Sequence, residues 1–262
     1  MRPHLSITSA ANPRYKSLRK LVQSSQERRH TGLSVLDGVH LVAAYRECVG
    51  TPRSLAVSRT GLANPEVRKL LEKMEGVEVL VLGDSLFEAL SSVATPTGIV
   101  AVIETPRPRA ALQRMDACAM LEDLQDPGNL GSILRSCAAA GVGHVLLSKG
   151  SVHAWSPRVL RAGMGAHFAL SIHEQVDLVA AAREFEGTRV ATRALSPRAV
   201  FDVDLRGRVA FLFGNEGSGL SATLLEAADA VVSIPMAGGA ESINVAAAAA
   251  VCLFERVRQL RQ

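Results

Sequence analysis

Gly214-Asn-Glu-Gly-Ser-Gly-Leu-Ser221 gives the clearest indication of architecture, because the apolar run Arg208-Val-Ala-Phe-Leu-Phe213 comes directly before it. That run is typical of a buried strand, so the glycines fall where a strand ends. Two more predicted strands lead into loops with glycine and polar residues, Cys118–Leu124 into Gln125–Arg135 and Ala230–Ile234 into Pro235–Asn244. Ligands of an open parallel sheet bind at the carboxyl ends of its strands. The three loops together therefore predict one site.

The C-terminal part of the chain alternates short apolar strands with helices. This alternation predicts an α/β fold whose parallel sheet is covered on both faces. The other predicted strands are His144–Leu147, Phe168–Ile172, Arg189–Thr192 and, within the run quoted above, Val209–Phe213. The predicted helices are one that reaches Ala140 and is capped by Gly141, and a last one at Ile243–Arg261.

The N-terminal part predicts a second, smaller α/β unit. It opens with a basic helical segment, Asn12–His30, in which Leu18, Leu21 and Val22 form an apolar stripe at helical spacing. Further predicted elements are strands at Leu33–Leu36, Ser54–Val57, Val77–Leu82 and Ile99–Ile103, and helices at Gly38–Cys48, at Pro65–Met74 and after the caps Asp84 and Ser85. We place the boundary at Glu104-Thr-Pro-Arg-Pro-Arg109, where two prolines favour extended chain. The expected domains are 1–104 and 117–262, with a linker at 105–116.

The composition is that of an ordinary globular protein. The chain has 262 residues, 48% hydrophobic and 21% charged, with a net charge of +4. This mild basic excess permits an anionic partner without demanding one, and the 4% of aromatic residues would give only a sparse platform for stacking bases. The longest apolar run, Val245–Phe254, is too short to span a bilayer, and Met1–Ala10 lacks the core of a signal peptide. We expect a soluble cytoplasmic protein without membrane contact.

The cysteines and histidines give no sign of a metal site. Cys48, Cys118, Cys137 and Cys252 lie far apart, and three of them sit inside apolar runs typical of a core. The histidines form no pair at ligand spacing, so we predict no bound metal.

Arg135 is the most informative charged residue. Asp126-Pro127-Gly128-Asn129 is typical of a turn that starts a helix, and Arg135 is expected in the second turn of that otherwise apolar helix. An arginine in this setting either pairs with a buried carboxylate or forks around an incoming phosphate or carboxylate. We favour the second reading.

The other two loops supply further candidates. The glycines alone can form the turn after Phe213, so Asn215 and Glu216 are not required for it. Ser242 and Asn244 follow a glycine pair at the start of the last helix. These are candidate ligand or catalytic residues, although either of the last two could be a simple helix cap. The glycine spacing matches neither a P-loop nor a dinucleotide fingerprint, so a bound nucleoside triphosphate or dinucleotide is not expected.

The last helix is apolar nearly all round as far as Phe254. Such a helix is buried on more than one side. The sheet can cover one face, and a second subunit would cover the other, so we predict a homodimer through the C-terminal domain.

Three motifs, in this order and separation, resemble those of the SpoU/TrmH family of RNA ribose 2′-O-methyltransferases, within the SPOUT superfamily. They are Asn129–Arg135 with Gly141, Gly214–Gly217, and Ile234–Met236 through Ser242–Val245. The resemblance covers the chain from Ala117 to its C-terminus. The basic N-terminal part looks like the ribosomal-protein-like substrate-binding domain of many members, with Asp37-Gly38 where Glu-Gly is frequent.

The resemblance implies a deep trefoil knot in the C-terminal domain and bound S-adenosylmethionine. Knots are nearly absent from proteins in general, so kinship alone carries that expectation. The positions that match cofactor contacts are Gly214, Ile234 and Ile243, with Thr192, Asn215 and Met236 close by.

The resemblance also implies the catalytic set Arg135, Asn129, Glu216, Ser242 and Asn244. Because arginine stays protonated in proteins, Arg135 is a better grip for an RNA phosphate than a general base. No general base is identified. Candidate RNA contacts in the N-terminal domain are Arg14, Lys16, Arg19 and Lys20, although such a helix is as often a solvated face.

The expected function is methyl transfer to a ribose 2′-hydroxyl of RNA, with ribosomal RNA favoured by the attached N-terminal domain. The alternatives are a transfer-RNA 2′-O-methyltransferase and a catalytically silent RNA-binding or ribosome-assembly protein of the same fold. Methylation of a base and a nicotinamide-dependent oxidoreductase are weaker alternatives, because the Ser242-Ile-Asn244 signature favours ribose and the dinucleotide fingerprint is missing.

Overall fold

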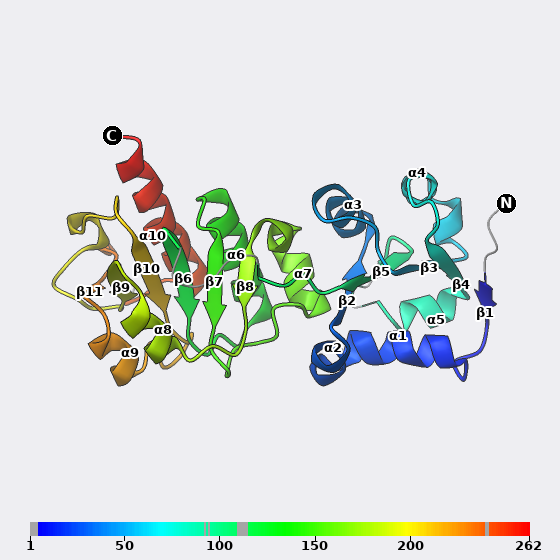
Figure 1. Cartoon of the computed structure of the whole chain (residues 1–262), viewed down its shortest axis with the longest axis horizontal. Helices are drawn as coiled ribbons and strands as arrows, with labels where there is room; N and C mark the ends of the chain where they lie inside the picture. The colour runs from blue at the N-terminus through cyan, green and yellow to red at the C-terminus, as the bar shows by residue number, and fades with distance from the viewer. Residues whose placement is uncertain (1–4, 92, 94, 109–114, 239–240) are drawn as a thin grey trace. The chain divides into compact units, whose positions relative to one another are not determined.

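In the computed structural model, the described residues are 5–91, 93, 95–108, 115–238 and 241–262. They form two compact units (Figure 1). One unit contains Met1–Pro106 together with Trp155–Phe168, and the other contains Arg107–Ala154 together with Ala169–Gln262. The segment 155–168, which the sequence places in the domain at 117–262, thus groups with the N-terminal unit. The expected linker lies partly outside the described residues, at 109–114, and its bounds stay a prediction.

The C-terminal unit is built on a six-stranded sheet in the order β11-β9-β10-β6-β7-β8 (Figure 1). Every pair of neighbouring strands is parallel. The strands are β6 (Ala117–Leu121), β7 (His144–Leu147), β8 (Ser171–His173), β9 (Thr188–Thr192), β10 (Val209–Phe213) and β11 (Ala230–Val232). The predicted parallel α/β architecture is confirmed.

Helices cover both faces of this sheet. The central strands β6 and β10 are buried along their whole length, as expected for a parallel sheet between helical layers. Cys118 and Leu212 face one layer, α8 (Leu178–Glu184) and α9 (Ala222–Glu226). The other layer, α6 (Pro127–Ala139) and α10 (Val245–Leu260), lies behind the sheet in Figure 1. These two helices pack against each other, and α10 also contacts β10.

Several ends of elements differ from the sequence-based expectation. β6 ends at Leu121 rather than Leu124, because Asp123 has a φ of +52°, a left-handed conformation that a strand cannot contain. β11 ends at Val232 rather than Ile234. The strand expected from Phe168 is wrong at its start, since Ala166–Ala169 is a 3-10 turn (η3) and β8 begins at Ser171.

The N-terminal unit has a five-stranded mixed sheet in the order β1-β4-β3-β5-β2. Its strands are β1 (Leu5–Ile7), β2 (Leu33–Asp37), β3 (Ser54–Ser58), β4 (Glu78–Leu82) and β5 (Ile99–Glu104). Its helices are α1 (Pro13–Gln23), α2 (Ser25–Thr31), α3 (Val39–Cys48), α4 (Pro65–Glu72), α5 (Asp84–Glu88) and α7 (Pro157–Gly163). Helices α1 and α5 pack on one face of the sheet through Tyr15, Leu18 and Phe87. Asp84 does not cap α5 as expected, because it accepts a hydrogen bond from the backbone N–H of Thr60 instead.

The basic segment Asn12–His30 is two helices rather than one. Ser24 ends α1 in an extended conformation and caps α2, with its hydroxyl accepting from the backbone N–H of Glu27. Arg28 is buried, and its guanidinium donates to the carbonyls of Leu21 and Val22 at the end of α1. The Arg28 guanidinium thus caps the C-terminal end of α1 instead of facing solvent.

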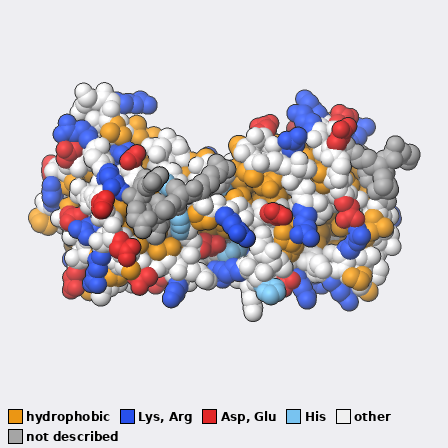
Figure 2. Space-filling view, viewed as in Figure 1, with side chains coloured by type: hydrophobic (Ala, Val, Ile, Leu, Met, Phe, Trp, Pro, Cys, Tyr) orange, Lys and Arg blue, Asp and Glu red, His pale blue; other side chains and the backbone are white. Residues whose placement is uncertain are grey.

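Charge on the face shown in Figure 2 is mixed, with basic and acidic side chains interspersed over both units. Among the candidate RNA contacts, Lys16, Arg19 and Lys20 are exposed on α1, whereas Arg14 is ion-paired with Glu78. The mild basic excess of the chain is therefore not gathered into one field on that face.

Three cysteines lie in the core, as the apolar runs predict. Burial raises the pKa of Cys118, Cys137 and Cys252 to about 12, so their thiols stay protonated. Cys48 is exposed.

Candidate functional site

The first wall of the site is the loop between β6 and α6. Asp126 caps α6, accepting from the backbone N–H of Asn129 at 2.7 Å, and Pro127 takes the first helical position, where a missing N–H costs nothing. The sequence therefore fixes the start of α6 closely. Asn129 is held in the first turn of this helix, at the carboxyl end of β6.

Glu216, from the loop after β10, reaches across to this turn. One carboxylate oxygen accepts from the side-chain amide of Asn129 at 3.0 Å and from the backbone N–H of Asp126 at 3.2 Å. The other accepts from the backbone N–H of Gln125 at 3.3 Å. Partial burial acts to raise the pKa of Glu216, but these hydrogen bonds outweigh it and lower the pKa below its ordinary value.

Asn244, at the start of α10, joins the same network. Its side-chain amide donates to the side-chain carbonyl of Asn129 at 2.8 Å. Its own side-chain carbonyl caps α10, accepting from the backbone N–H groups of Ala246 and Ala247. The structure thus brings together Asn129, Glu216 and Asn244, one from each of the three predicted loops.

Arg135 and Ser242 do not join this network. Arg135 is exposed in the third turn of α6, one turn later than expected, because the helix already begins at Pro127. Within the described part of the chain, neither the side chain of Arg135 nor that of Ser242 has a hydrogen bond or ion pair. The Arg135 guanidinium therefore does not pair with a buried carboxylate, and it is accessible to an incoming anion.

Thr192, Gly214 and Ile234, three of the predicted cofactor positions, follow or end neighbouring strands. Thr192 ends β9, between β10 and β11, and its hydroxyl donates to the carbonyl of Leu212 at 3.1 Å. Gly214 directly follows β10, and Ile234 lies two residues beyond β11. The carboxyl ends of parallel strands meet at one sheet edge, so the three positions share it.

Gly214 cannot be replaced by a larger residue without a rearrangement. A Cβ atom at this position would collide with the backbone of Gly219 and Leu220. The loop after β10 folds back on itself there, and Asn215 pairs with Gly219 through two backbone hydrogen bonds of 3.0 Å. The apolar candidates Ile234 and Met236 are half-buried, and the Ile243 side chain is exposed.

The side chain of Asn215 makes hydrogen bonds within the protein through both its nitrogen and its oxygen. It donates to the backbone carbonyl of Asp123 at 2.7 Å and accepts from the backbone N–H groups of Gly217 and Ser218. Because its main chain also pairs with Gly219, Asn215 shapes the loop, and a contact between Asn215 and the cofactor stays a prediction.

Sequence reasoning missed the residues that support these loops from the side. Ser148, directly after β7, exchanges hydrogen bonds with Asp123, and the side-chain amide of Gln125 donates to the carbonyl of Gly150 at 2.6 Å. A Cβ at Gly150 would collide with the Asp123 carboxylate. The left-handed turn at Asp123 is not visible in an apolar pattern, although a Ser-Lys-Gly-Ser run after a predicted strand could have pointed to this loop.

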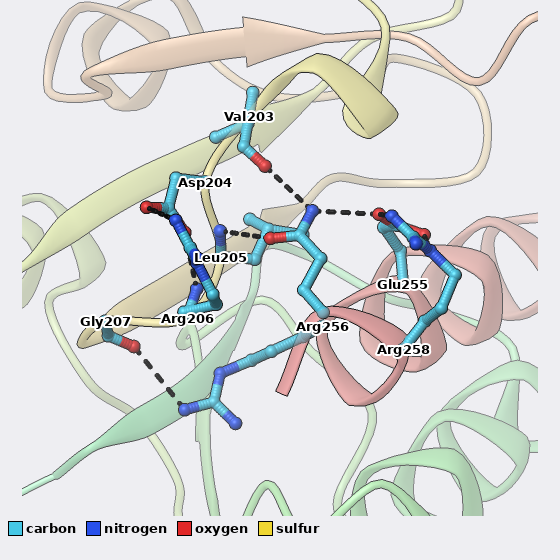
Figure 3. A network of polar contacts seen from close by, with 9 residues as sticks. Val203, Asp204, Leu205, Arg206, Gly207, Glu255, Arg256 and Arg258 are labelled. Atoms are coloured by element: carbon cyan, nitrogen blue, oxygen red, sulfur yellow. Dashed lines mark hydrogen bonds and ion pairs between the residues drawn. The ribbon is translucent and has the colours of Figure 1, made fainter. Parts of the chain in front are cut away.

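The far end of α10 is fixed by a second polar network (Figure 3). Gln259 donates to the carbonyl of Val203 at 2.9 Å and to Glu255 at 2.8 Å, and it accepts from the backbone N–H of Leu205. Arg258 makes two further hydrogen bonds to Glu255 and lowers its pKa. The helix that Asn244 caps at its N-terminus is therefore also held at its last turns.

Across the described ranges, no set of three or more His, Cys, Asp or Glu side chains is arranged to hold a metal ion. In the same residues, no helix is long and apolar enough to cross a membrane.

Comparison with known proteins agrees with this geometry. The family model of the SpoU rRNA Methylase family matches residues 116–254, and that of the MRM3-like substrate binding domain matches residues 12–101. A Synechocystis protein described as an uncharacterized tRNA/rRNA methyltransferase is 35% identical, covering 97% of this chain and 94% of the relative. The Bacillus subtilis 23S rRNA (guanosine(2553)-2′-O)-methyltransferase RlmP is 32% identical, covering 95% and 97%.

Solved structures are similar over nearly the whole chain. The crystal structure of an RNA 2′-O ribose methyltransferase has a TM-score of 0.83 at 31% identity, covering 98% of this chain and all of the other. The AdoMet-bound rRNA methyltransferase from Sinorhizobium meliloti has a TM-score of 0.83 at 28% identity, covering 97% and 98%.

Proposed function

The chain belongs to the SpoU rRNA methylase family, and on that premise we propose that it methylates a ribose 2′-hydroxyl of ribosomal RNA with S-adenosylmethionine. The observation that carries the assignment is the chain of hydrogen bonds from Asn244 through Asn129 to Glu216, which joins the three family motifs at one sheet edge. Relatives named as 23S rRNA methyltransferases make 23S rRNA the first substrate to test.

The edge formed by β9, β10 and β11 fits S-adenosylmethionine. The three glycines in the loop Gly214–Leu220 carry no side chains that would keep a ligand away from the main chain, and half-buried Ile234 and Met236 offer apolar surface beside the loop. Main-chain groups suit the polar edges of adenine and of the amino-acid end. When bound, S-adenosylmethionine supplies an electrophilic methyl group on a sulfonium.

Arg135 is proposed to hold the RNA. Its guanidinium is always charged and offers a planar fork that matches a phosphate. Because it has no partner in the described structure, it needs no rearrangement to bind one. Gripping the phosphate next to the reacting ribose would orient the 2′-hydroxyl, and orientation supplies much of the acceleration of such a transfer. Ser242, exposed two residues before Asn244 in the same motif, is proposed to contact the ribose.

Glu216 is proposed to act by holding loops together rather than as the general base. Its carboxylate already accepts hydrogen bonds from three groups, and its lowered pKa makes it a weak proton acceptor near neutral pH. Asn129 and Asn244 are held in fixed amide orientations by the same bonds. We propose that this network sets the distance between the cofactor loops and the helix that carries Arg135.

The N-terminal unit is proposed to contribute RNA affinity through the exposed basic face of α1, formed by Lys16, Arg19 and Lys20. Arg14 can add to it by exchanging Glu78 for a phosphate. That exchange is easy, because exposed ion pairs contribute on the order of 1 kcal/mol or less.

We also propose a homodimer through the C-terminal unit. Ala247 and Phe254 on α10 are exposed, the latter to 47%, and Val251 between them is only half-buried. At this spacing they form one apolar stripe, which a second copy of α10 would cover. A deep trefoil knot and a cytoplasmic location complete the proposal.

The decisive experiment combines calorimetry with a methyl-transfer assay on ribosomal RNA from cells that lack this protein. Wild type should bind S-adenosylmethionine and methylate one ribose. Arg135→Ala should lose methyl transfer at least about a hundredfold while its cofactor Kd changes less than about twofold. Activity of Arg135→Ala close to wild type contradicts the role of Arg135. Transfer to tRNA but not to rRNA favours the alternative substrate, and cofactor binding without transfer favours a silent RNA-binding protein.

A further inference from the structure

We infer that Asp123 and Ser148 form a positioning pair that sets the cofactor loop Gly214–Leu220 from outside the three family motifs. The inference rests on the proposed function, because the cofactor role of that loop is part of it. Neither residue is expected to touch the cofactor. Their effect passes through Asn215.

The backbone of Asp123 is unusual for a residue other than glycine. Its φ of +52° lies in the left-handed region, where Asp and Asn are the most tolerated after glycine. This conformation turns its carbonyl to accept from the side-chain amide of Asn215 at 2.7 Å and from that of Gln125 at 3.3 Å. A strained residue that persists beside a binding loop is held there by its surroundings.

Ser148 holds Asp123 in this conformation. Its hydroxyl accepts from the backbone N–H of Asp123 at 2.8 Å and lies 2.5 Å from the Asp123 carboxylate, to which it donates. Ser148 is itself fixed at the end of β7, since its backbone N–H donates to the carbonyl of Leu121 at 3.1 Å. The turn at Asp123 is thus locked by a neighbouring strand.

Asn215 connects the turn at Asp123 to the cofactor loop. With its amide bound to Asp123, its side-chain carbonyl faces the backbone N–H groups of Gly217 and Ser218 and closes the loop. The residue before Asp123 holds the other end, because the Glu122 carboxylate accepts from both the backbone N–H and the hydroxyl of Ser221 at 2.7 Å. Two consecutive residues after β6 therefore fix both ends of the loop.

The test measures cofactor Kd by calorimetry, kcat and KM by methyl transfer, and the Tm of each variant. Ser148→Ala and Asp123→Ala should each raise the Kd for S-adenosylmethionine about fivefold or more, the equivalent of one lost hydrogen bond. The KM for the cofactor should rise in step while kcat at saturation changes less than about threefold. Asp123→Asn should restore near-wild-type affinity, since asparagine tolerates the left-handed turn and keeps an acceptor for Ser148.

Two comparisons separate positioning from general instability. Asp123→Gly relaxes the backbone but removes the acceptor, so its Tm should stay near wild type while its Kd rises. The double variant Ser148→Ala/Asp123→Ala should have a Kd for S-adenosylmethionine no higher than that of the worse single variant, because both substitutions remove the same hydrogen-bonded pair. Ser136→Ala is the matched control, since that hydroxyl donates only to the carbonyl of Ser132 in its own helix.

Unchanged cofactor Kd in Ser148→Ala and Asp123→Gly overturns the inference while leaving the proposed function intact. The inference is also overturned if Asp123→Asn raises the Kd for S-adenosylmethionine as much as Asp123→Ala does. Failure of wild type to bind S-adenosylmethionine overturns both, and calorimetry on the wild-type protein decides that first.

Discussion

The side-chain amide of Asn244 donates to the side-chain carbonyl of Asn129 at 2.8 Å, although 115 residues separate them in sequence. This bond ties the first turn of α10 to the first turn of α6. It also fixes which way each amide faces, because the Asn129 amide nitrogen is then left to donate to Glu216. Asn129, Glu216 and Asn244, one polar residue from each of the three loops, therefore act as one unit.

Asn244→Asp separates the two roles of this residue. Aspartate caps a helix as well as asparagine does, so we expect the free energy of unfolding to change by less than about 0.5 kcal/mol. The variant loses the donor to Asn129 and places a negative charge against a carbonyl oxygen. Methyl transfer should fall at least about tenfold. Chemical denaturation and an activity assay check this, and wild-type activity would show that the bond is dispensable.

Glu216→Gln should lower the stability of the protein near neutral pH but have little effect at acidic pH. The pKa of Glu216 is lowered in the folded protein, so the carboxylate stabilises the fold above its unfolded pKa of about 4.3. That contribution is lost as the pH falls through the folded-state pKa. The Tm difference between wild type and Glu216→Gln should therefore be largest near neutral pH and shrink toward pH 3. A difference that is constant with pH contradicts the assignment.

Gly214→Ala should impair the cofactor loop because its Cβ would collide with the backbone of Gly219 and Leu220. We expect a loss of about 1–3 kcal/mol in the free energy of unfolding, the range for overpacking, and cofactor Kd raised at least about tenfold. Gly217→Ala is the control, since its Cβ would lie 3.6 Å from the Asn215 side-chain oxygen, an ordinary contact. Equal behaviour of the two variants in calorimetry and denaturation would argue against this.

Phe254→Glu should convert the proposed dimer to a monomer. Phe254 is 47% exposed on the apolar stripe of α10, and a carboxylate buried there without a partner would cost several kcal/mol of association. Light scattering after size-exclusion chromatography measures the mass directly. Val49→Glu, at an exposed position of the N-terminal unit, is the matched control. A wild-type protein that is monomeric at all concentrations removes the proposal.

Much of this architecture could be predicted because its signals are local. Apolar runs followed by glycine gave the central strands, including β7 and β10 at their observed bounds. The meeting of Asn129, Glu216 and Asn244 follows from the rule that parallel strands end at one edge. Their catalytic roles, like those of Arg135 and Ser242, stay predictions.

What the sequence did not reveal depends on contacts between distant residues. Helices α8 and α9 are short, and so few residues carry little periodic signal. Arg28 looked like one more basic surface residue, and only its carbonyl partners explain its burial. The turn at Asp123 depends on Ser148, which directly follows another strand, β7.

Neither compact unit is a continuous piece of chain, because Trp155–Phe168 belongs with Met1–Pro106. During translation the first unit cannot be completed until the ribosome has polymerised well into the second. Cleaving the chain near residue 106 would separate the N-terminal fragment from Trp155–Phe168, which completes its unit, whereas the C-terminal fragment would keep all of its own. An evolutionary exchange of the N-terminal module alone would meet the same obstacle, so the two modules are expected to be inherited together.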